Sequence, residues 1–415
     1  MKNILSFFFL LSFYCLTAQT ITINGKVLNK TDNQVIPYCA IGSMNTNKGT
    51  VCNENGEFVL NTDSNEILVI SLIGFEKKTI NIQSLPNKKD VIIYLEPTSY
   101  QLSEVSILAI SPLEIIKNAI NKIQTNYPLK PCILSGFYRE TMEDNKKYTR
   151  LLEAAVNIYD PGFNPRKNKL NEITKLIAVR SSYNLSPIFK GLHYNGITEL
   201  YHRNLVKYVG DFLNEKNFNN YVYQLDSVTV LNEEAVYVIS FNPKKDIEKV
   251  LSEGKMFIRK KDFAILEINY GINKNAKYWT DSKFNDTLLW NTNHIQVNLK
   301  FTERNHLLYL NYVSKKYENV YYKQDKSKPE IISIAFSELM INNIQTENVQ
   351  AFKKNDAMNT KNDLFVQKTN YDSLFWNNYN IIKATALQEK VKKDLEKQKT
   401  LEQQYLSEDP SKLKK

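Results

Sequence analysis

The positions of apolar and polar residues along this chain predict strands far more often than helices. The segment HIQVNLKF at 294–301 is the clearest case, because Ile295, Val297, Leu299 and Phe301 alternate with polar residues, as in a strand with one buried face and one wet face. Similar segments recur through the second part of the chain, separated by hairpin-sized polar turns. The strands predicted there span residues 133–142, 148–160, 173–183, 221–231, 235–243, 254–270, 294–301, 307–322 and 330–341.

The first part of the chain, residues 20–96, predicts a series of shorter strands. GTVC and GEFVL flank the turn NENG, where Asn55 and Gly56 tolerate positive φ. Phe58 and Leu60 are expected to face the core. Short strands with regularly spaced turn signals predict a small antiparallel β-sandwich.

Helical spacing is confined to a few segments. The sequence SPLEIIKNAINKIQTNY begins with Ser111 as a predicted N-cap and has Glu114 three residues later, as in a capping box. Residues 200–213 carry a mixed helical signal. We therefore expect one short helix at 111–127, buried against a sheet.

The tail is predicted to be helical over residues 381–406. Leu387, Val391 and Leu395 form a narrow apolar stripe on an otherwise charged helix. Docking on its own domain is the preferred interpretation, and a short coiled coil with a partner is the alternative.

These patterns place the chain in the mainly β class, as a β-sandwich followed by an α+β domain. The second domain is expected to hold a large curved antiparallel sheet with a few helices, followed by a C-terminal helix. The predicted divisions are a signal peptide at 1–18, the β-sandwich at 20–96, a connector at 97–110, an α+β domain with a long antiparallel meander at 111–380, and a charged amphipathic helix and tail at 381–415.

The N-terminus predicts export. Lys2 precedes an almost unbroken apolar run at 4–16, and Ala18 offers a small residue for cleavage. Cys15 raises the question of lipid attachment, but Tyr14 stands where a small residue would be needed, so cleavage after Ala18 is preferred. No later apolar run is long enough for a transmembrane span. We expect an exported protein, periplasmic or outer-membrane-associated.

The net charge of +10 does not predict a nucleic-acid partner, because the lysines are scattered along the chain and export argues against it. A Lys- and Asn-rich solvated surface is the favoured explanation. A weak attraction to anionic lipid or polysaccharide stays open.

Cysteine usage is thin for an exported protein. After cleavage Cys39, Cys52 and Cys132 remain, an odd number, so no disulfide framework is expected. Cys39 and Cys52 lie in neighbouring predicted strands and either form a disulfide or are small buried hydrophobic residues. The second alternative is preferred.

The first domain resembles a known family. GKVLNKTDNQVIPYCAI, NKGTVCNENGEFVL, LVISLIGFEKKTINI, VIIYLEP and QLSEVSI are similar to the carboxypeptidase-regulatory-like domain. The resemblance implies a transthyretin-like β-sandwich that is not itself catalytic, of the kind found N-terminal to TonB-dependent receptors. Cys52 and Asn53 stand where the family usually has Thr and Asp, a departure that does not threaten the fold.

A weaker resemblance concerns the second domain. A Tyr-rich strand, an Asn-Pro turn and the hairpin from Gly254 to Tyr270 are similar to lipoprotein-carrier-like half-barrels. This resemblance implies a concave sheet face that binds acyl chains, and it serves only as an analogy.

The sequence supports no catalytic site, metal site or cofactor. The four histidines form no HExxH or HxH pattern, and no GxSxG elbow, phosphate-binding loop or dinucleotide fingerprint is present. Glu199 and His202 make one E-x-x-H, half of what a di-iron bundle needs, and are interpreted as solvated helix residues. Glu140, Glu143 and Asp144 are interpreted as a polar hairpin.

The 25 tyrosines and 20 phenylalanines are the remaining candidates for ligand contact. A tyrosine-lined sheet face stacks on sugars, grips acyl chains or simply fills a core. Trp279 and Trp290 are the candidate exposed contacts, because both lie near predicted loops. Trp376 is expected to anchor the tail helix.

Three functional hypotheses follow, in order of preference. The first is a non-catalytic envelope protein whose sandwich is an interaction module. The second is a periplasmic carrier or chaperone that binds a lipid or other apolar ligand in the curved sheet. The third is an unrecognised hydrolase. The expected partner is accordingly an envelope protein or an apolar ligand, and the sequence leaves the oligomeric state open.

Overall fold

The structure is a computed structural model of the 415-residue chain. It describes the chain from residue 20 to residue 407, apart from several internal segments. The residues left undescribed between these limits are 47, 99–109, 164–170, 187, 189–195, 246, 248–249, 273–277, 282–287, 324–328, 361, 363, 365–366, 368 and 370–373. The predicted signal peptide and most of the predicted connector therefore lie outside the described residues.

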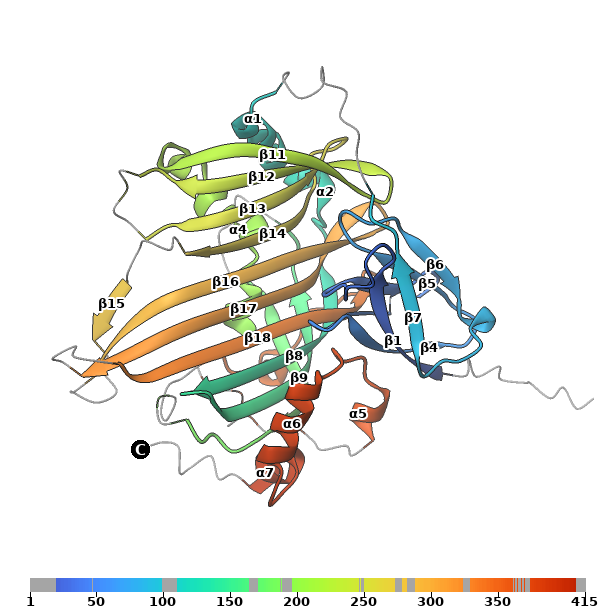
Figure 1. Cartoon of the computed structure of the whole chain (residues 1–415), viewed down its shortest axis with the longest axis vertical. Coiled ribbons are helices and arrows are strands. Elements are labelled where there is room, and N and C mark those ends of the chain that lie inside the picture. The colour runs from blue at the N-terminus through green and yellow to red at the C-terminus, as the bar shows by residue number, and fades with distance from the viewer. Residues whose placement is uncertain are drawn as a thin grey trace, which may run out of the picture.

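The N-terminal domain is a sandwich of two small sheets, as predicted (Figure 1). The strand orders are β4-β1-β7 and β3-β2-β5-β6. The strands are β1 (Thr20–Asn29), β2 (Ala40–Ser43), β3 (Gly49–Val51), β4 (Glu57–Asp63), β5 (Ile67–Ser71), β6 (Lys78–Asn81) and β7 (Val91–Leu95). The prediction of a purely antiparallel sandwich was wrong in one place, because β1 and β7 pair in parallel.

The turn before β4 has the predicted role. Gly56 has φ +71°, and a Cβ there would lie 2.7 Å from the carbonyl oxygen of Val27, so the position requires glycine. Phe58 and Leu60 are fully buried in the sandwich core. The turn at Gly56 and the strand that follows it therefore have a structural role.

The second domain is built on one large antiparallel sheet. Its strand order is β10-β9-β8-β18-β17-β16-β14-β13-β12-β11, and β15 (Tyr278–Asp281) pairs with β16. The other strands are β8 (Cys132–Asp144), β9 (Lys147–Asp160), β10 (Ile173–Ser181), β11 (Tyr221–Leu231), β12 (Glu234–Pro243), β13 (Ser252–Arg259), β14 (Ile265–Ile272), β16 (Leu288–Arg304), β17 (Leu307–Lys323) and β18 (Pro329–Gln345). The meander is interrupted by one long-range pairing, since the first strand, β8, lies beside the last, β18.

One face of this sheet is apolar and is covered by short helices. The helices are α1 (Pro112–Asn121), α2 (Ile123–Asn126), α3 (Gly196–Tyr201) and α4 (Leu205–Tyr208), and their buried residues form a single cluster with the strands. Ser111 caps α1 as predicted, with its hydroxyl accepting from the Glu114 amide at 3.2 Å.

The hairpin β8–β9 is present as predicted, but two of the three carboxylates interpreted as marking a polar hairpin are buried. Glu140 is 1% exposed and pairs with Arg150 at 3.1 Å. Asp144 is also buried and accepts a hydrogen bond from Thr149 at 3.1 Å. Helix α3 lies over Glu140, since a Cβ on Gly196 would be only 2.8 Å from its Oε2, a long-range effect that local polarity does not reveal.

The C-terminal helix is divided in two. Thr385 and Gln388 form a capping box that starts α6 (Ala386–Leu395), and a second helix, α7 (Leu401–Ser407), follows. Val391 is buried, whereas Leu387 is 52% exposed, so the predicted stripe faces its own domain only in part. No helix in the described part of the chain has the length and apolar character needed to cross a membrane.

An extended strap at residues 379–383 joins the two domains, and side chains from the sandwich and the sheet alternate in binding its carbonyl oxygens. Sandwich side chains donate to Tyr379, Ile381 and Lys383, whereas sheet side chains donate to Asn380 and Ile382. From residue 379 to residue 383, the side chains that donate to these carbonyl oxygens are Asn61 (3.5 Å, to Tyr379), Asn342 (2.9 Å, to Asn380), Thr50 (3.3 Å, to Ile381), Arg139 (2.9 Å, to Ile382) and Asn53 (3.1 Å, to Lys383). The sandwich is therefore docked on its own large domain.

Candidate functional site

A row of polar side chains crosses all ten consecutive strands of the large sheet. Each member is the cross-strand partner of the next. From β11 to β10 the row is Gln224, Ser240, Lys255, Asn269, Asn298, Ser314, Glu338, Arg139, Glu153 and Arg180. Neighbours along these strands point to the other face and join the apolar core, among them Ile239, Met256, Ile268, Leu299, Val313, Leu339, Tyr138, Ala154 and Val179. The sheet thus has a polar face opposite its helix-covered face.

A cleft of about 610 Å³ lies over the middle of this polar face. The sheet forms its floor, the 37–38 and 53–54 loops of the sandwich form one wall, and residues 382–388 form another. The lining residues are Pro37, Tyr38, Asn53, Glu54, Thr141, Glu143, Tyr148, Glu267, Asn269, Gln296, Asn298, Lys300, Ser314, Lys316, Ile334, Phe336, Glu338, Ile382, Thr385, Leu387 and Gln388. We take this cleft as the candidate functional site, since its volume suits a small ligand.

The lining combines polar side chains with a few rings and four aliphatic residues, Pro37, Ile334, Ile382 and Leu387. Five side-chain amides and two tyrosines line the cleft, together with Phe336. Each amide offers donors and an acceptor, and the rings offer flat apolar faces. The lining also holds four glutamates and two lysines, a formal charge of −2 in a chain of net charge +10.

Two tyrosines mark the sandwich side and the sheet side of the cleft. Burial raises the pKa of Tyr38 to about 12, and Glu338 and Glu54 add to this shift. Burial likewise raises the pKa of Tyr148, with Glu143 and Glu54 contributing. Glu54 of the sandwich lines the same cleft as both tyrosines and contributes to both shifts, so the two domains build one electrostatic environment.

Lys300 ties the cleft floor to the sandwich. Its ammonium group lies 3.4 Å from a carboxylate oxygen of Glu267 and donates to the carbonyl oxygen of Tyr38 at 3.4 Å. The Tyr38 backbone has φ +55°, an uncommon conformation for a bulky residue. Its ring packs on Tyr312 at 5.7 Å between centroids. Side chains of the large sheet therefore fix the position of the 37–38 loop, which forms one wall of the cleft.

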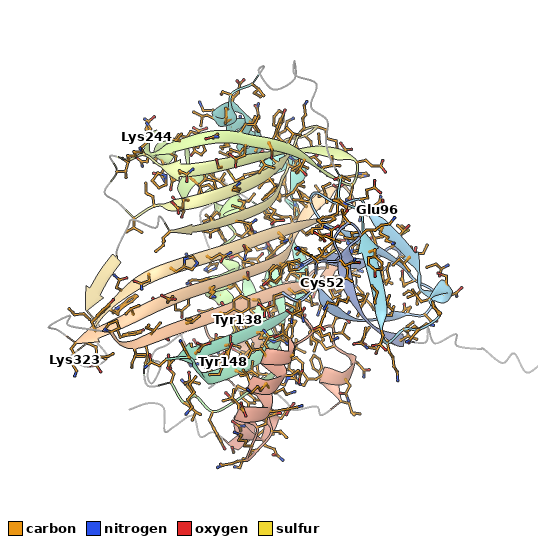
Figure 2. The ribbon with its side chains drawn as sticks, viewed as in Figure 1. Cys52, Glu96, Tyr138, Tyr148, Lys244 and Lys323 are labelled. Carbon is orange, nitrogen blue, oxygen red and sulfur yellow. The ribbon has the colours of Figure 1, made fainter. Side chains whose placement is uncertain are left out.

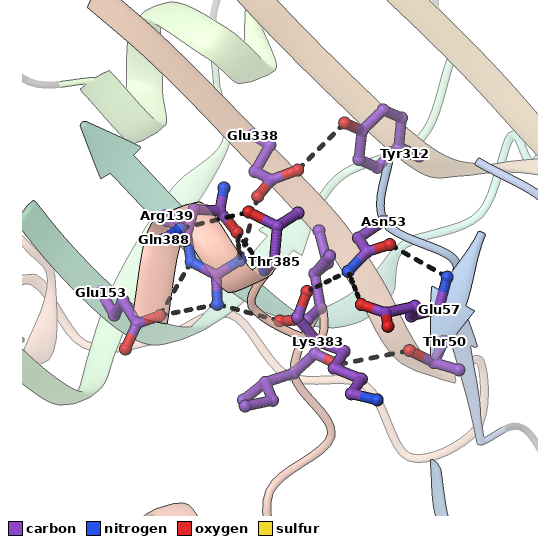
Figure 3. A network of polar contacts seen from close by, with 12 residues as sticks. Thr50, Asn53, Glu57, Arg139, Glu153, Tyr312, Glu338, Lys383, Thr385 and Gln388 are labelled. Atoms are coloured by element: carbon purple, nitrogen blue, oxygen red, sulfur yellow. Dashed lines mark hydrogen bonds and ion pairs between the residues drawn. The ribbon is translucent and has the colours of Figure 1, made fainter. Parts of the chain in front are cut away.

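The inner end of the cleft is closed by a buried ionic network (Figure 3). Arg139 donates to Glu153 at 2.8 Å and to Glu338 at 3.3 Å, and Tyr312 donates to Glu338 at 3.1 Å. Burial alone would raise the pKa of Glu153, but Arg180 and Arg139 outweigh it and lower the pKa to about 2. For Glu338 burial prevails over Arg139, so its pKa is raised.

The residues singled out from the sequence lie elsewhere. Trp290 is half-buried in β16 and stacks on Tyr321 at 6.5 Å, and the side chain of Trp279 lies outside the described residues. Neither is among the cleft residues, and their role as exposed contacts stays a prediction. Trp376 does anchor the tail, because it packs on Phe137 and carries the guanidinium of Arg180 over its ring at 4.4 Å.

Glu199 and His202 do not share a site. Glu199 pairs with Lys315 at 2.5 Å, whereas His202 lies 3.8 Å from Glu172. Burial lowers the pKa of His202. Both side chains are partly exposed, Glu199 by 30% and His202 by 26%, so they are partly solvated residues that also have ionic partners. No group of potential ligands among the described residues could hold a metal ion.

The three cysteines that follow the predicted cleavage point are free and buried, as the preferred alternative had it. The amide of Cys52 donates to the carbonyl oxygen of Cys39 at 3.0 Å, so the two are cross-strand neighbours. Figure 2 shows Cys52 at the junction of the sandwich with the large sheet.

Comparisons with known proteins identify the first domain. Residues 23–107 match the CarboxypepD_reg-like domain family, which confirms the resemblance of the sandwich. No curated protein matches the chain.

Solved structures similar to the chain include three proteins of 9–11% identity, each aligned over 58% of this chain. They are an outer membrane lipoprotein-sorting protein domain from Vibrio parahaemolyticus (9% identity, 94% of that chain, TM-score 0.26), a LolA superfamily protein from Nitrosomonas europaea (9%, 96%, 0.24) and a DUF1329 family protein from Desulfovibrio piger (11%, 96%, 0.25). Their names agree with the weaker sequence resemblance, but TM-scores this low do not establish a shared fold.

Proposed function

We propose that this protein is a non-catalytic, exported envelope protein that binds a small polar ligand in the cleft between the sandwich and the large sheet. The single observation that carries this proposal is the 610 Å³ cleft, whose walls come from both domains. In this proposal the sandwich acts as an interaction module by completing a binding site within its own chain.

The lining favours a neutral ligand with hydroxyl and amide groups, such as an oligosaccharide. Side-chain amides satisfy ligand hydroxyls and amides alike, and the rings of Tyr38, Tyr148 and Phe336 are available for the apolar faces of sugar rings. The formal charge of −2 in the lining opposes anionic lipid or polysaccharide, even though the whole chain is basic.

The alternative of a lipid carrier receives less support from the described residues. An acyl chain needs an apolar cavity, and the apolar face of the sheet is packed by α1 to α4 into one continuous core. The cleft lies on the opposite, polar face. Glu338 and the amides at its floor would lose hydration to a lipid tail without gaining hydrogen bonds.

The test is binding of the β-1,4-linked trimer of N-acetylglucosamine to the mature protein, measured by calorimetry and by amide chemical shifts. We expect shifts confined to cleft residues. Tyr148→Ala should weaken binding about tenfold, which corresponds to ~1.4 kcal/mol of ring contact.

Tyr94→Ala is the matched control, because Tyr94 is 37% exposed on the sandwich and does not line the cleft. It should bind the trimer like the unmodified protein. Mass spectrometry of an organic extract of the purified protein tests the competing carrier hypothesis, because it detects a bound lipid. A stoichiometric lipid, combined with no shift in any cleft residue on adding the trimer, would replace this proposal by the carrier hypothesis.

A further inference from the structure

Arg304 at the end of β16 lies at the interface between the large sheet and the sandwich. Its guanidinium is half-buried, and its Nε has no hydrogen-bond partner among the described residues. A Cβ placed on Gly42 of the sandwich would lie only 3.0 Å from Nη2. Burial lowers the pKa of Arg304, and no carboxylate offsets this effect.

The other arginines that the structure describes all have an acidic partner. Those in ion pairs are Arg139, Arg150, Arg180, Arg203 and Arg259. Arg304 is the exception within the described part of the chain. A buried polar atom left without a partner usually has a water or an ion beside it, and a charged one is costly to leave alone.

A small pocket of about 30 Å³ adjoins the guanidinium. It is lined by Ala40, Ile41, Gly42, Gly49, Thr302, Arg304, Asn311, Ile341 and Ile344. None of these residues is acidic, whereas Thr302 and Asn311 carry side-chain donors. A water needs roughly 10–15 Å³ on this measure, so the pocket has room for about two or three water-sized occupants.

We propose that this pocket binds a small inorganic anion of about the size of chloride. A water would satisfy the free N–H but would leave the charge uncompensated, whereas an anion does both. The pocket is too small for a five-atom oxyanion such as phosphate. The anion lies outside the cleft of the proposed function, and it would strengthen the contact between β2–β3 and β16–β18.

The direct test is a crystal of the mature protein grown in sodium bromide. An anomalous bromide peak beside Arg304 Nε is expected. The solution test compares melting temperatures in sodium chloride and in sodium gluconate at equal ionic strength. Gluconate is too large for the pocket and serves as the reference salt. The melting temperature should therefore rise more steeply with sodium chloride concentration than with sodium gluconate concentration.

Arg304→Gln should abolish this chloride-specific rise, because it removes the charge while keeping a shorter polar side chain. Lys244→Gln is the matched control, since it removes one positive charge at an exposed position far from this interface (Figure 2), and it should keep the rise. If Arg304→Gln does not fold, Gly42→Ala takes its place, because the added methyl encroaches on the guanidinium. Equal melting in both salts, or a chloride effect that survives the substitution, would overturn the anion site.

Discussion

Replacing Arg139 by methionine should destabilise the protein, since one guanidinium binds two strands of the large sheet and the strap that joins the domains. It contacts Glu153 and Glu338 and donates to the carbonyl oxygen of Ile382 in the strap at 2.9 Å. Arg139 is 1% exposed, and both glutamates are 3% exposed. Methionine fills most of the side-chain volume, so the change removes the charge and hydrogen bonds without opening a large cavity.

The expected loss of stability is large because buried Glu338 loses the cation it pairs with and buried Glu153 loses one of its two. Breaking a buried ion pair by removing one partner costs about 3–5 kcal/mol, most of it the penalty of the charge left behind. Arg180 still neutralises Glu153, which holds the loss to this range although two glutamates are affected. For a domain of this size, the melting temperature should fall by roughly 6–10 °C.

The assay is thermal and urea unfolding at pH 7, followed by tryptophan fluorescence and circular dichroism. Lys261→Met is the control, because its pair with Glu234 is exposed and such pairs contribute about 0–1 kcal/mol. If Arg139→Met melts within 2 °C of that control (roughly 1 kcal/mol), the buried network does not stabilise the fold and the reasoning fails.

Two further predictions follow from local geometry and charge. Gly56→Ala should lower the melting temperature by several degrees, since the residue has φ +71° and the new Cβ meets the Val27 carbonyl oxygen; a differential scan compares it with the unmodified protein. Glu153 has its pKa lowered from 4.5 to about 2, so its contribution, on the order of 3 kcal/mol, is present above pH 4.5 and lost as the pH falls toward 2. Glu153→Gln should flatten this acid limb of the stability profile, and an unchanged limb would contradict the assignment.

Local features of the fold were predictable because they depend on neighbouring residues. The alternation in 294–301 predicted part of β16, the N-cap at Ser111 started α1, and the glycine turn at Gly56 was correct. Pairings between distant segments were not predictable in this way. Nothing in β8 shows that its partner is β18, almost 200 residues away, because strand order is decided by packing of the whole core.

The cleft was missed for the same reason, although part of its signal is local. In β16 the polar phase Gln296, Asn298 and Lys300 was recognised as the wet face, and all three residues line the cleft. What the alternation could not show is that Tyr38 and Asn53 of the sandwich face them, about 250 residues earlier in the chain. Proximity to predicted loops favours Trp279 and Trp290 instead, and neither lines the cleft.

The strap gives a last prediction about how the two domains are joined. The side chain of Asn380 takes the place of a neighbouring strand, because its Oδ1 accepts from the Asn61 amide at 2.7 Å and its Nδ2 donates to the Asn61 carbonyl oxygen at 3.2 Å. Both residues are buried. Asn380→Ala leaves these backbone groups without partners, at a cost on the order of 2 kcal/mol.

Hydrogen exchange at the Asn61 amide measures this effect directly. Exchange should accelerate about tenfold or more in Asn380→Ala, since each 1.4 kcal/mol corresponds to a factor of ten. Asn377→Ala, an exposed position in α5 (Phe375–Asn378) just before the strap, should leave the amide protected. If the Asn61 amide stays equally protected in Asn380→Ala, the sandwich is held by its other contacts, and the strap does not fix the wall of the cleft.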